Sequence, residues 1–82
     1  MWFAYALQSQ ADGWLYIGMT SDLKRRLEEH NRGYNRSTRS RRPFELFYVE
    51  ECTSRKEARE QEKFLKSGKG REFLRQKLAA RG

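Results

Sequence analysis

Three short segments of the chain carry the apolar and polar pattern of β-strands. The first, residues 2–8, is apolar at both odd and even positions, which is typical of a central strand buried on both faces. Residues 14–20 form the second and follow the turn signal Asp12-Gly13, so the two should pair as an antiparallel hairpin. A third strand is predicted over residues 44–51, after a proline that cannot extend a ladder.

Between the second and third strands the sequence carries helix signals. Thr20 and Ser21 are candidates for the N-cap, and Asp22 suits the first helical turn. A helix is therefore predicted over residues 22–31, ended by Gly33. The remaining residues up to Pro43 are predicted to form a loop.

Two further helices are predicted after the third strand. Ser54 and Glu57 have the spacing of a capping box, and the helix that they begin continues to about Ser67, where Gly68 supplies the stop. Apolar residues at positions 73, 74 and 78 support a short last helix. The chain, residues 1–82, is thus predicted to be one α+β, sandwich-like domain. Its small three-stranded, mainly antiparallel sheet is flanked by helices in the order β-β-α-β-α-α.

The first predicted helix carries polar residues on the face that should pack against the sheet. At about 100° per residue, Arg26 and His30 share a face with Leu23 and Leu27. Arg26 either lays its methylenes on the edge of the core or belongs to a site. His30 is either a partly exposed residue at the helix end or a site residue. The solvent face of this helix carries the basic residues Lys24 and Arg25.

The second helix places a carboxylate among residues that should be buried. Glu62 falls on one face with Ala58, Gln61 and Leu65. Buried glutamates are rare unless they are paired or bind a metal. The alternatives to a metal site are an ion pair with Arg26 or with a nearby lysine.

Tyr16 and Gly18 share one face of the second strand. A glycine within a strand often marks close approach by another backbone or a ligand. Tyr16 is either a core aromatic with a satisfied hydroxyl or part of a site. Together with the polar residues of the helices, these two supply a phenol, a guanidinium, an imidazole and a carboxylate. Phosphodiester cleavage calls for such groups.

The composition favours an anionic polymer as partner. Eighteen Lys and Arg residues stand against 11 Asp and Glu residues, which gives a net charge of +7. A membrane surface would call for a basic amphipathic helix, which no segment fits well, and a merely solubilising charge excess is the other alternative. Cys52 and His30 are the only residues of their kinds, so neither a disulfide within the chain nor a Cys/His zinc site is expected. Without a signal peptide or membrane span, a cytoplasmic location is expected.

The predicted loop is the most basic part of the chain. It holds five arginines and no acidic residue, with Tyr34 and Asn35 among them. An ordinary solvated loop is the alternative, but like charges without a partner repel one another. The loop is therefore predicted to contact phosphates through its arginines, with base stacking on the tyrosine.

These residues resemble the GIY-YIG nuclease family. Tyr16-Ile17-Gly18 matches its second motif, and Phe3-Ala4-Tyr5 stands in place of the first while keeping the tyrosine. Arg26 lies eight residues after the motif glycine, where the family places its arginine, and His30 follows one turn later. Glu62 matches the glutamate that binds metal, with Lys66 downstream. The match covers most of the chain and is strongest to short single-domain bacterial members.

The resemblance implies a metal-dependent endonuclease, with one Mg²⁺ or Mn²⁺ ion held by Glu62. Tyr16 would act as general base, and Tyr5 would position the water. Arg26 would stabilise the developing charge, while His30 would hydrogen-bond Tyr16 or the phosphate. The residues expected to contact nucleic acid are Gly18, Lys24, Arg25, Arg32, Arg36, Arg39, Arg41, Arg42 and Lys66.

DNA is favoured over RNA as the substrate. Two alternatives stay open. One is a nucleic-acid-binding module without catalysis, for which the altered first motif and the lack of an Asn or His after the glutamate argue. The other is a subunit that cleaves only when a protein partner supplies specificity.

Overall fold

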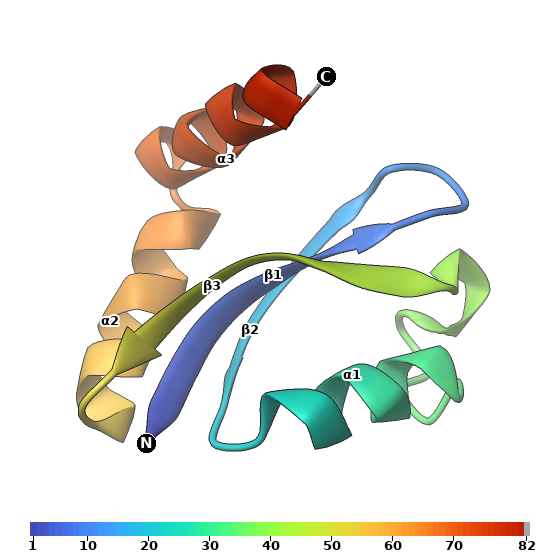
Figure 1. The fold of residues 1–82 in the computed structure, drawn as a ribbon, viewed down its shortest axis with the longest axis horizontal. Coiled ribbons are helices and arrows are strands. Elements are labelled where there is room, and N and C mark those ends of the chain that lie inside the picture. Colours follow the sequence, from blue (N-terminus) through green and yellow to red (C-terminus); the bar gives the residue numbers. More distant parts are fainter. Residues whose placement is uncertain (82) are drawn as a thin grey trace.

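The chain forms a three-stranded sheet with its first strand in the centre (Figure 1). A computed structural model describes residues 1–81, with the elements β1 (Trp2–Ser9), β2 (Leu15–Thr20), α1 (Leu23–Asn31), the 3₁₀ turn η1 (Arg39–Arg41), β3 (Phe44–Cys52), α2 (Arg55–Lys66) and α3 (Gly68–Arg81). β1 pairs antiparallel with both neighbours, so the sheet order is β2-β1-β3. The predicted fold class, element order and central first strand are confirmed.

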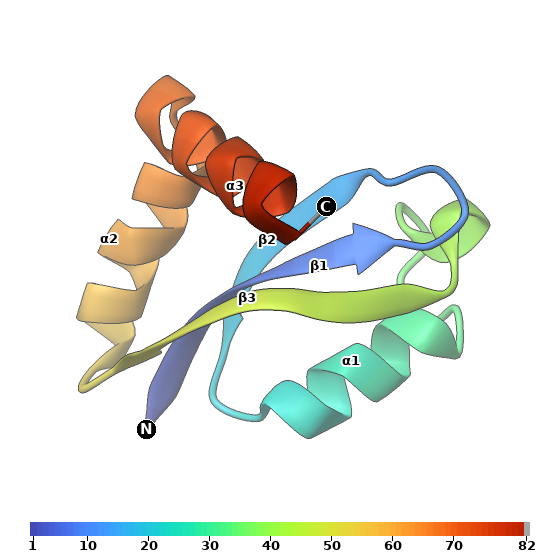
Figure 2. The ribbon, with the colours of Figure 1, turned by 45° about the horizontal axis from the view of Figure 1, so that its top comes forward.

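Different helices cover the two faces of the sheet, as Figures 1 and 2 show. On one face Ala4 and Ala6 of β1 pack with Leu65 of α2 and Leu74 of α3 in an apolar core. The intervening positions of β1 point to the face covered by α1, where the buried cluster is Tyr5, Leu7 and Phe44. The period-two alternation of a strand thus sends adjacent residues of β1 into two different environments.

Helix α1 is capped by Asp22, not by the predicted Thr20 or Ser21. The Asp22 carboxylate accepts a hydrogen bond from the Arg25 amide at 3.1 Å, which satisfies one of the free N–H groups of the first turn. The Thr20 hydroxyl instead accepts from the Asp22 amide, also at 3.1 Å. At the other end Gly33 has a φ of 80°, so the predicted glycine stop is confirmed.

The start of α2 is also as predicted, because the Ser54 hydroxyl accepts from the Glu57 amide. The predicted end of α2 near Ser67 is confirmed, because Ser67 is the C-cap. The stopping role predicted for Gly68 is wrong, since Gly68 is the first residue of α3 and does not have a positive φ. The glycine that the bend requires is Gly70, where a Cβ would overlap the carbonyl oxygen of Phe64. The last helix has 14 residues and is longer than predicted. Within residues 1–81 no helix has the length and apolar character needed to cross a membrane.

Candidate active site

The two tyrosines of the sheet share the α1 face beside Gly18. Tyr5 lies directly opposite Gly18 in the pairing of β1 with β2, and its side chain is 1% exposed. A Cβ at Gly18 would lie 2.6 Å from the Tyr5 hydroxyl oxygen and 3.3 Å from the Tyr16 ring. Glycine is therefore required there because the Tyr5 phenol lies across the strand. The ring centroids of Tyr5 and Tyr16 are 6.5 Å apart.

Arg26 reaches from α1 toward both phenols. Close contact with Tyr5, and more weakly with Tyr16, raises the pKa of its guanidinium, so this group is always charged. The approach falls outside hydrogen-bond geometry, because neither the Tyr5 hydroxyl nor Arg26 Nε has a hydrogen-bond partner, although both atoms are buried. Arg26 Nη1 lies 3.4 Å from a carboxylate oxygen of Glu29, which also pairs with Arg25.

The hydroxyl of Tyr5 is poorly suited to ionise. Burial is the largest influence and raises its pKa, and the interactions with Tyr16 and with the carboxylate of Glu62 act in the same direction. The guanidinium of Arg26 lowers the pKa but does not cancel the rise. Tyr5 is therefore neutral at physiological pH, which suits a hydrogen-bonding group better than a base.

His30 is buried, so the alternative of a partly exposed residue at the helix end is wrong. Its side chain is 1% exposed because the ring packs against Tyr16, at 4.6 Å between centroids, and against the edge of Phe44. Nδ1 lies 2.9 Å from the Thr38 hydroxyl oxygen, whereas the buried Nε2 has no partner. Burial, followed by the charge of Arg26, lowers the pKa of His30, so the ring is neutral near pH 7.

Glu62 lies on the packed side of α2, flanked by the buried Ala58 and Leu65 as the helical spacing predicts. Its side chain is 21% exposed, and one oxygen lies 3.5 Å from Lys66 Nζ. The observed ion pair is therefore with a lysine and not with Arg26. Its negative charge is the smallest of the influences on the Tyr5 phenol, and it raises the pKa of that group. No group of three or more His, Cys, Asp or Glu side chains forms a ready metal cage within residues 1–81.

Hollows surround the guanidinium of Arg26. A pocket of about 410 Å³ is lined by Arg26, Glu29, His30, Tyr34, Asn35 and Arg36. Arg26 also lines a neighbouring pocket with the N-terminus of α1 and another with Trp2 and Arg55. A more apolar pocket of about 240 Å³ lies between β2 and α3, and none of the predicted site residues lines it. The space for a substrate beside the predicted site thus opens at Arg26.

The sequence model of the GIY-YIG catalytic domain matches residues 1–76. This chain belongs to the GIY-YIG family. GIY-YIG catalytic domains are of nuclease type, and the resemblance seen in the sequence motifs is confirmed.

The relatives of this GIY-YIG domain include several UPF0213 proteins. UPF0213 protein DP2720 of Desulfotalea psychrophila is 48% identical over 67 residues, which are 79% of this chain and 60% of the relative. A UPF0213 protein of Bacillus pumilus is 51% identical over 53 residues, covering 63% of this chain and 54% of the relative. The matched part thus spans little more than half the length of these relatives.

A solved structure has the same fold. The solution NMR structure of the UPF0213 protein BH0048 from Bacillus halodurans superposes with a TM-score of 0.53 and is 35% identical. The superposition covers 90% of this chain and 82% of that one.

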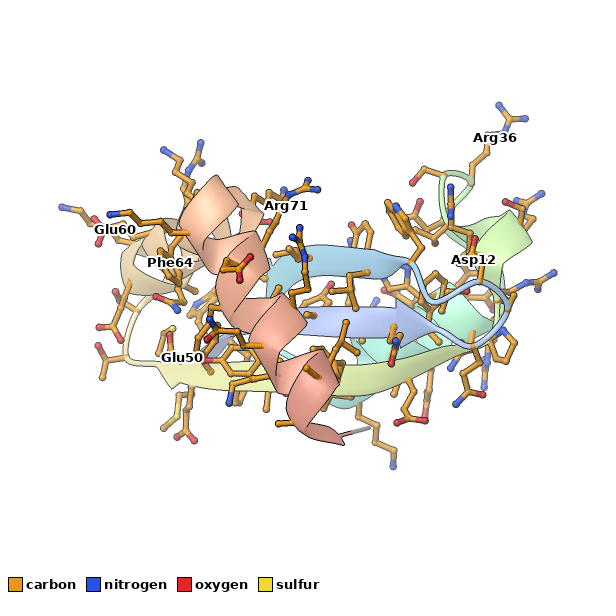
Figure 3. The ribbon with its side chains drawn as sticks, turned by 90° about the horizontal axis from the view of Figure 1, so that it is seen from above. Asp12, Arg36, Glu50, Glu60, Phe64 and Arg71 are labelled. Atoms are coloured by element: carbon orange, nitrogen blue, oxygen red, sulfur yellow. The ribbon has the colours of Figure 1, made fainter. Side chains whose placement is uncertain are left out.

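Three of the five arginines in the basic loop of this GIY-YIG domain make contacts that hold the loop in place. Arg41 pairs with Asp12 at 2.6 Å and stacks over the Trp14 ring, which ties the loop to the β1–β2 turn. Two others hold the loop to itself, because Arg39 Nε donates to the Gly33 carbonyl and Arg42 Nε to the Arg39 carbonyl. The other two, Arg32 and Arg36, are exposed. Figure 3 shows Arg36 projecting outward from the loop.

The remaining predicted contacts are basic side chains on the helices. Lys24 and Arg25 are exposed on α1, and Lys66 is exposed on α2 where it pairs with Glu62. The sequence reasoning missed two partners of the site. Glu29 follows Arg26 by three residues, a spacing that signals a helical ion pair. Thr38, the second, lies in the loop, where no helical or strand periodicity indicates which way a side chain points.

Proposed function

We propose that this domain is a metal-dependent endonuclease that hydrolyses phosphodiester bonds of nucleic acid, with DNA preferred. The observation that supports the proposal is one cluster of complementary groups beside a pocket large enough for a phosphodiester. Sheet and helices contribute to it from distant parts of the chain. Its members are Tyr5, Tyr16, Arg26, His30 and Glu62.

Tyr16 and His30 form the basic half of the cluster. A phenol is a weak base unless its own proton has an acceptor nearby. His30 lies against the Tyr16 ring and is neutral near pH 7, so it is available as that acceptor. Tyr16 takes a proton from the attacking water while its hydroxyl proton passes toward the imidazole. Tyr5, whose buried hydroxyl stays protonated, orients the water.

Arg26 forms the electrostatic half. Negative charge accumulates on the phosphoryl oxygens as the water attacks, and a fixed cation at that place lowers the barrier. The planar guanidinium presents several N–H donors to those oxygens, and Glu29 holds one of its nitrogens. The buried Nε of Arg26 has no hydrogen-bond partner, so it can donate to a phosphoryl oxygen of the substrate.

The residues present fit one hard cation and not a pair. Glu62 is a single, partly buried carboxylate, and within residues 1–81 it pairs with the exposed Lys66, a partner that a metal ion could displace. Mg²⁺ commonly takes one or two carboxylates and completes its shell with water and phosphate oxygens. When bound, Mg²⁺ or Mn²⁺ would act as a Lewis acid on the phosphoryl group. Lys66, released from its ion pair with Glu62, would then be able to pair with a phosphate of the substrate.

The basic loop supports binding of the substrate backbone. Exposed Arg36 and the exposed ring of Tyr34 line the same pocket as Arg26. Each cation that neutralises a phosphate of duplex DNA contributes about 0.9 to the slope of log K against log salt. Replacing Arg36 by Gln should reduce the slope by about that amount, whereas an unchanged slope would argue against this contact.

The test is cleavage of labelled single-stranded, nicked, flapped and branched DNA, with RNA controls, in Mg²⁺, Mn²⁺ or EDTA. The wild type should give metal-dependent products, while Glu62→Gln and Tyr16→Phe should bind and not cut. Glu60→Gln is the matched control, because Glu60 is exposed on the same helix. If wild type and variants all bind and none cuts, the binding module or the partner-dependent subunit is the better description.

A further inference from the structure

The two ring nitrogens of His30 have different surroundings. Nδ1 is hydrogen-bonded to Thr38, while Nε2 is buried and has no hydrogen-bond partner. A neutral imidazole carries its proton on one nitrogen only, so one of the two is a donor and the other an acceptor. What His30 can do in the site depends on which nitrogen holds the proton.

The environment of Thr38 favours one of the two tautomers. Its hydroxyl has a single hydrogen, and Oγ1 lies 3.4 Å from the Asn35 carbonyl oxygen, which can only accept. With that hydrogen directed to Asn35, Oγ1 presents a lone pair to His30, and Nδ1 must be the donor at 2.9 Å. Thr38 is 1% exposed, so water does not compete for this bond.

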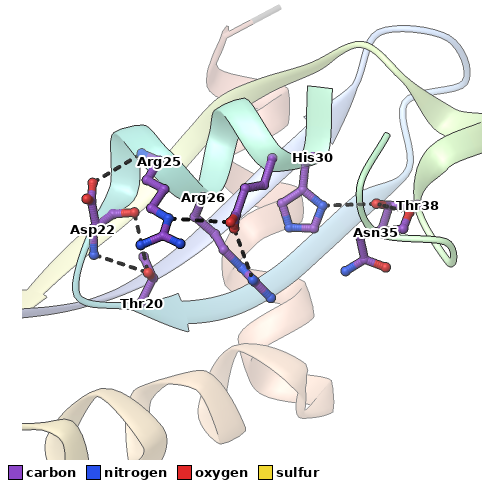
Figure 4. A network of polar contacts seen from close by, with 8 residues as sticks. Thr20, Asp22, Arg25, Arg26, His30, Asn35 and Thr38 are labelled. Atoms are coloured by element: carbon purple, nitrogen blue, oxygen red, sulfur yellow. Dashed lines mark hydrogen bonds and ion pairs between the residues drawn. The ribbon is translucent and has the colours of Figure 1, made fainter. Parts of the chain in front are cut away.

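The charge of Arg26 favours the same tautomer. Figure 4 shows Arg26 and Thr38 on opposite sides of the His30 ring. A ring nitrogen on the side of a guanidinium is better placed as a lone pair than as an N–H, because the cation repels the positive end of the bond. An N–H at Nε2 would also be a buried donor without an acceptor.

The loop is built around Thr38. Its amide donates to the Asn35 carbonyl, and its own carbonyl accepts from the Arg41 amide. The Asn35 side chain accepts from the amide and the hydroxyl of Ser37, which fixes the turn before Thr38. The loop therefore places this hydroxyl against His30 as well as presenting its arginines.

We propose that Thr38 is a positioning residue that holds His30 in the Nδ1-protonated tautomer, so that Nε2 is the proton acceptor of the site. This inference rests on the proposed nuclease function for its catalytic meaning. An Nε2 lone pair accepts from a hydroxyl and does not donate to a phosphate oxygen. In this tautomer, His30 accepts a proton from the Tyr16 hydroxyl and does not hydrogen-bond the phosphate.

The proton balance follows from this assignment. A water proton moves to the Tyr16 oxygen as the Tyr16 hydroxyl proton moves to His30 Nε2. The water oxygen forms its bond to phosphorus, and the bond from phosphorus to the leaving oxygen breaks. The imidazolium keeps donating from Nδ1 to Thr38 and then returns its proton to the leaving oxygen or to solvent.

The direct test is a long-range ¹H–¹⁵N correlation spectrum of the purified chain above pH 7. His30 is the only histidine, so its two ring nitrogens are assigned without ambiguity. Wild type should show a pyrrole-like shift at Nδ1 and a pyridine-like shift at Nε2. The opposite pattern would overturn the proposal, and this result needs no variant and no activity.

Two substitutions test whether Thr38 is the cause. Thr38→Val keeps the shape and removes the hydroxyl, so the tautomers should mix, while Thr38→Ser should restore the wild-type pattern. Amide spectra confirm that each variant is folded. If folded Thr38→Val keeps a pure Nδ1-protonated ring, Thr38 is not the determinant. If Thr38→Val does not fold, a changed tautomer in Thr38→Ser overturns the proposal and an unchanged one supports it.

Cleavage separates this inference from the proposed function. Thr38→Val should lower kcat by about tenfold to a hundredfold, as expected for loss of an orienting hydrogen bond, with binding of nucleic acid changed less than about twofold. Thr38→Ser should cleave close to the wild-type rate. An Nδ1-protonated His30 in a wild type that cuts no substrate would overturn the nuclease function and leave the tautomer assignment standing. Equal kcat in Thr38→Val and wild type would overturn the positioning role.

Discussion

The two faces of the sheet bury different kinds of side chain, although alternate residues of the same strand, β1, contribute to both. On the α2 and α3 face, the fully buried core cluster consists of the apolar residues Ala4, Ala6, Leu65 and Leu74. On the α1 face, the buried groups include Tyr5, His30 and Thr38.

The difference is clearest in the hydrogen bonds that are missing. Within the described residues, the buried side-chain polar atoms without a partner are Tyr5 Oη, Arg26 Nε and His30 Nε2, all on the α1 face. A buried polar group without a partner costs about 1–3 kcal/mol, so such atoms are rare unless something outside the chain satisfies them. The α1 face therefore holds buried polar groups that a substrate could satisfy, and Glu62 joins them from α2 on the other side of the sheet.

The largest expected effect is on the apolar face. Leu65 is completely buried, and Leu65→Ala should lower the free energy of unfolding by about 2–5 kcal/mol through lost burial and a cavity. Denaturant unfolding measures this, with exposed Lys63→Ala as a control expected to change stability by less than about 0.5 kcal/mol. Cleavage per folded molecule should not change. If kcat per folded molecule fell together with stability, the apolar face would contribute to catalysis as well as to folding.

Arg26→Lys should have the next largest effect, on activity and not on stability. The substitution keeps the charge and removes the planar fork, so we expect kcat to fall by about a hundredfold. Arg59→Lys is the matched control, since Arg59 is exposed on α2 and is neither a predicted site residue nor a predicted contact to nucleic acid. Equal cleavage rates for the two variants would remove Arg26 from the proposed mechanism.

Tyr5→Phe sharpens the comparison because it should separate stability from function. Removing a buried hydroxyl that has no partner should leave the free energy of unfolding unchanged or raise it by up to about 1 kcal/mol. Cleavage should fall, since the proposed water-orienting hydroxyl is lost. A variant less stable by more than about 1 kcal/mol would show that the hydroxyl is bonded in solution.

The smallest effect is a pH dependence of stability from His30. Burial and Arg26 lower its pKa in the folded state, so near pH 6 the unfolded chain binds the proton more readily. The contribution of His30 is fully present above its unfolded pKa of about 6.5 and is lost as pH falls below it. Thermal unfolding between pH 7.5 and about pH 5.5 should show a steeper fall in Tm for wild type than for His30→Gln. Parallel curves would contradict the buried, neutral ring.

The sequence by itself determined the fold and identified the polar residues that lie on packed faces. Periodicity and capping signals are local, so they predicted the strands, the first two helices and the packed faces on which Arg26, His30 and Glu62 lie. The errors at Asp22 and Gly68 are also local, because several neighbouring residues offer acceptable caps and stops. Each such choice is made within one or two helical turns.

Only the tertiary structure decided how those positions combine. It brought Tyr16 beside His30, paired Arg41 with Asp12 and buried His30 against Thr38. Loops lie between the members of each pair, and the path of a loop depends on individual hydrogen bonds and not on a repeating pattern. Periodicity predicts which way a side chain points from its own helix or strand, but not which residue from another part of the chain it will meet.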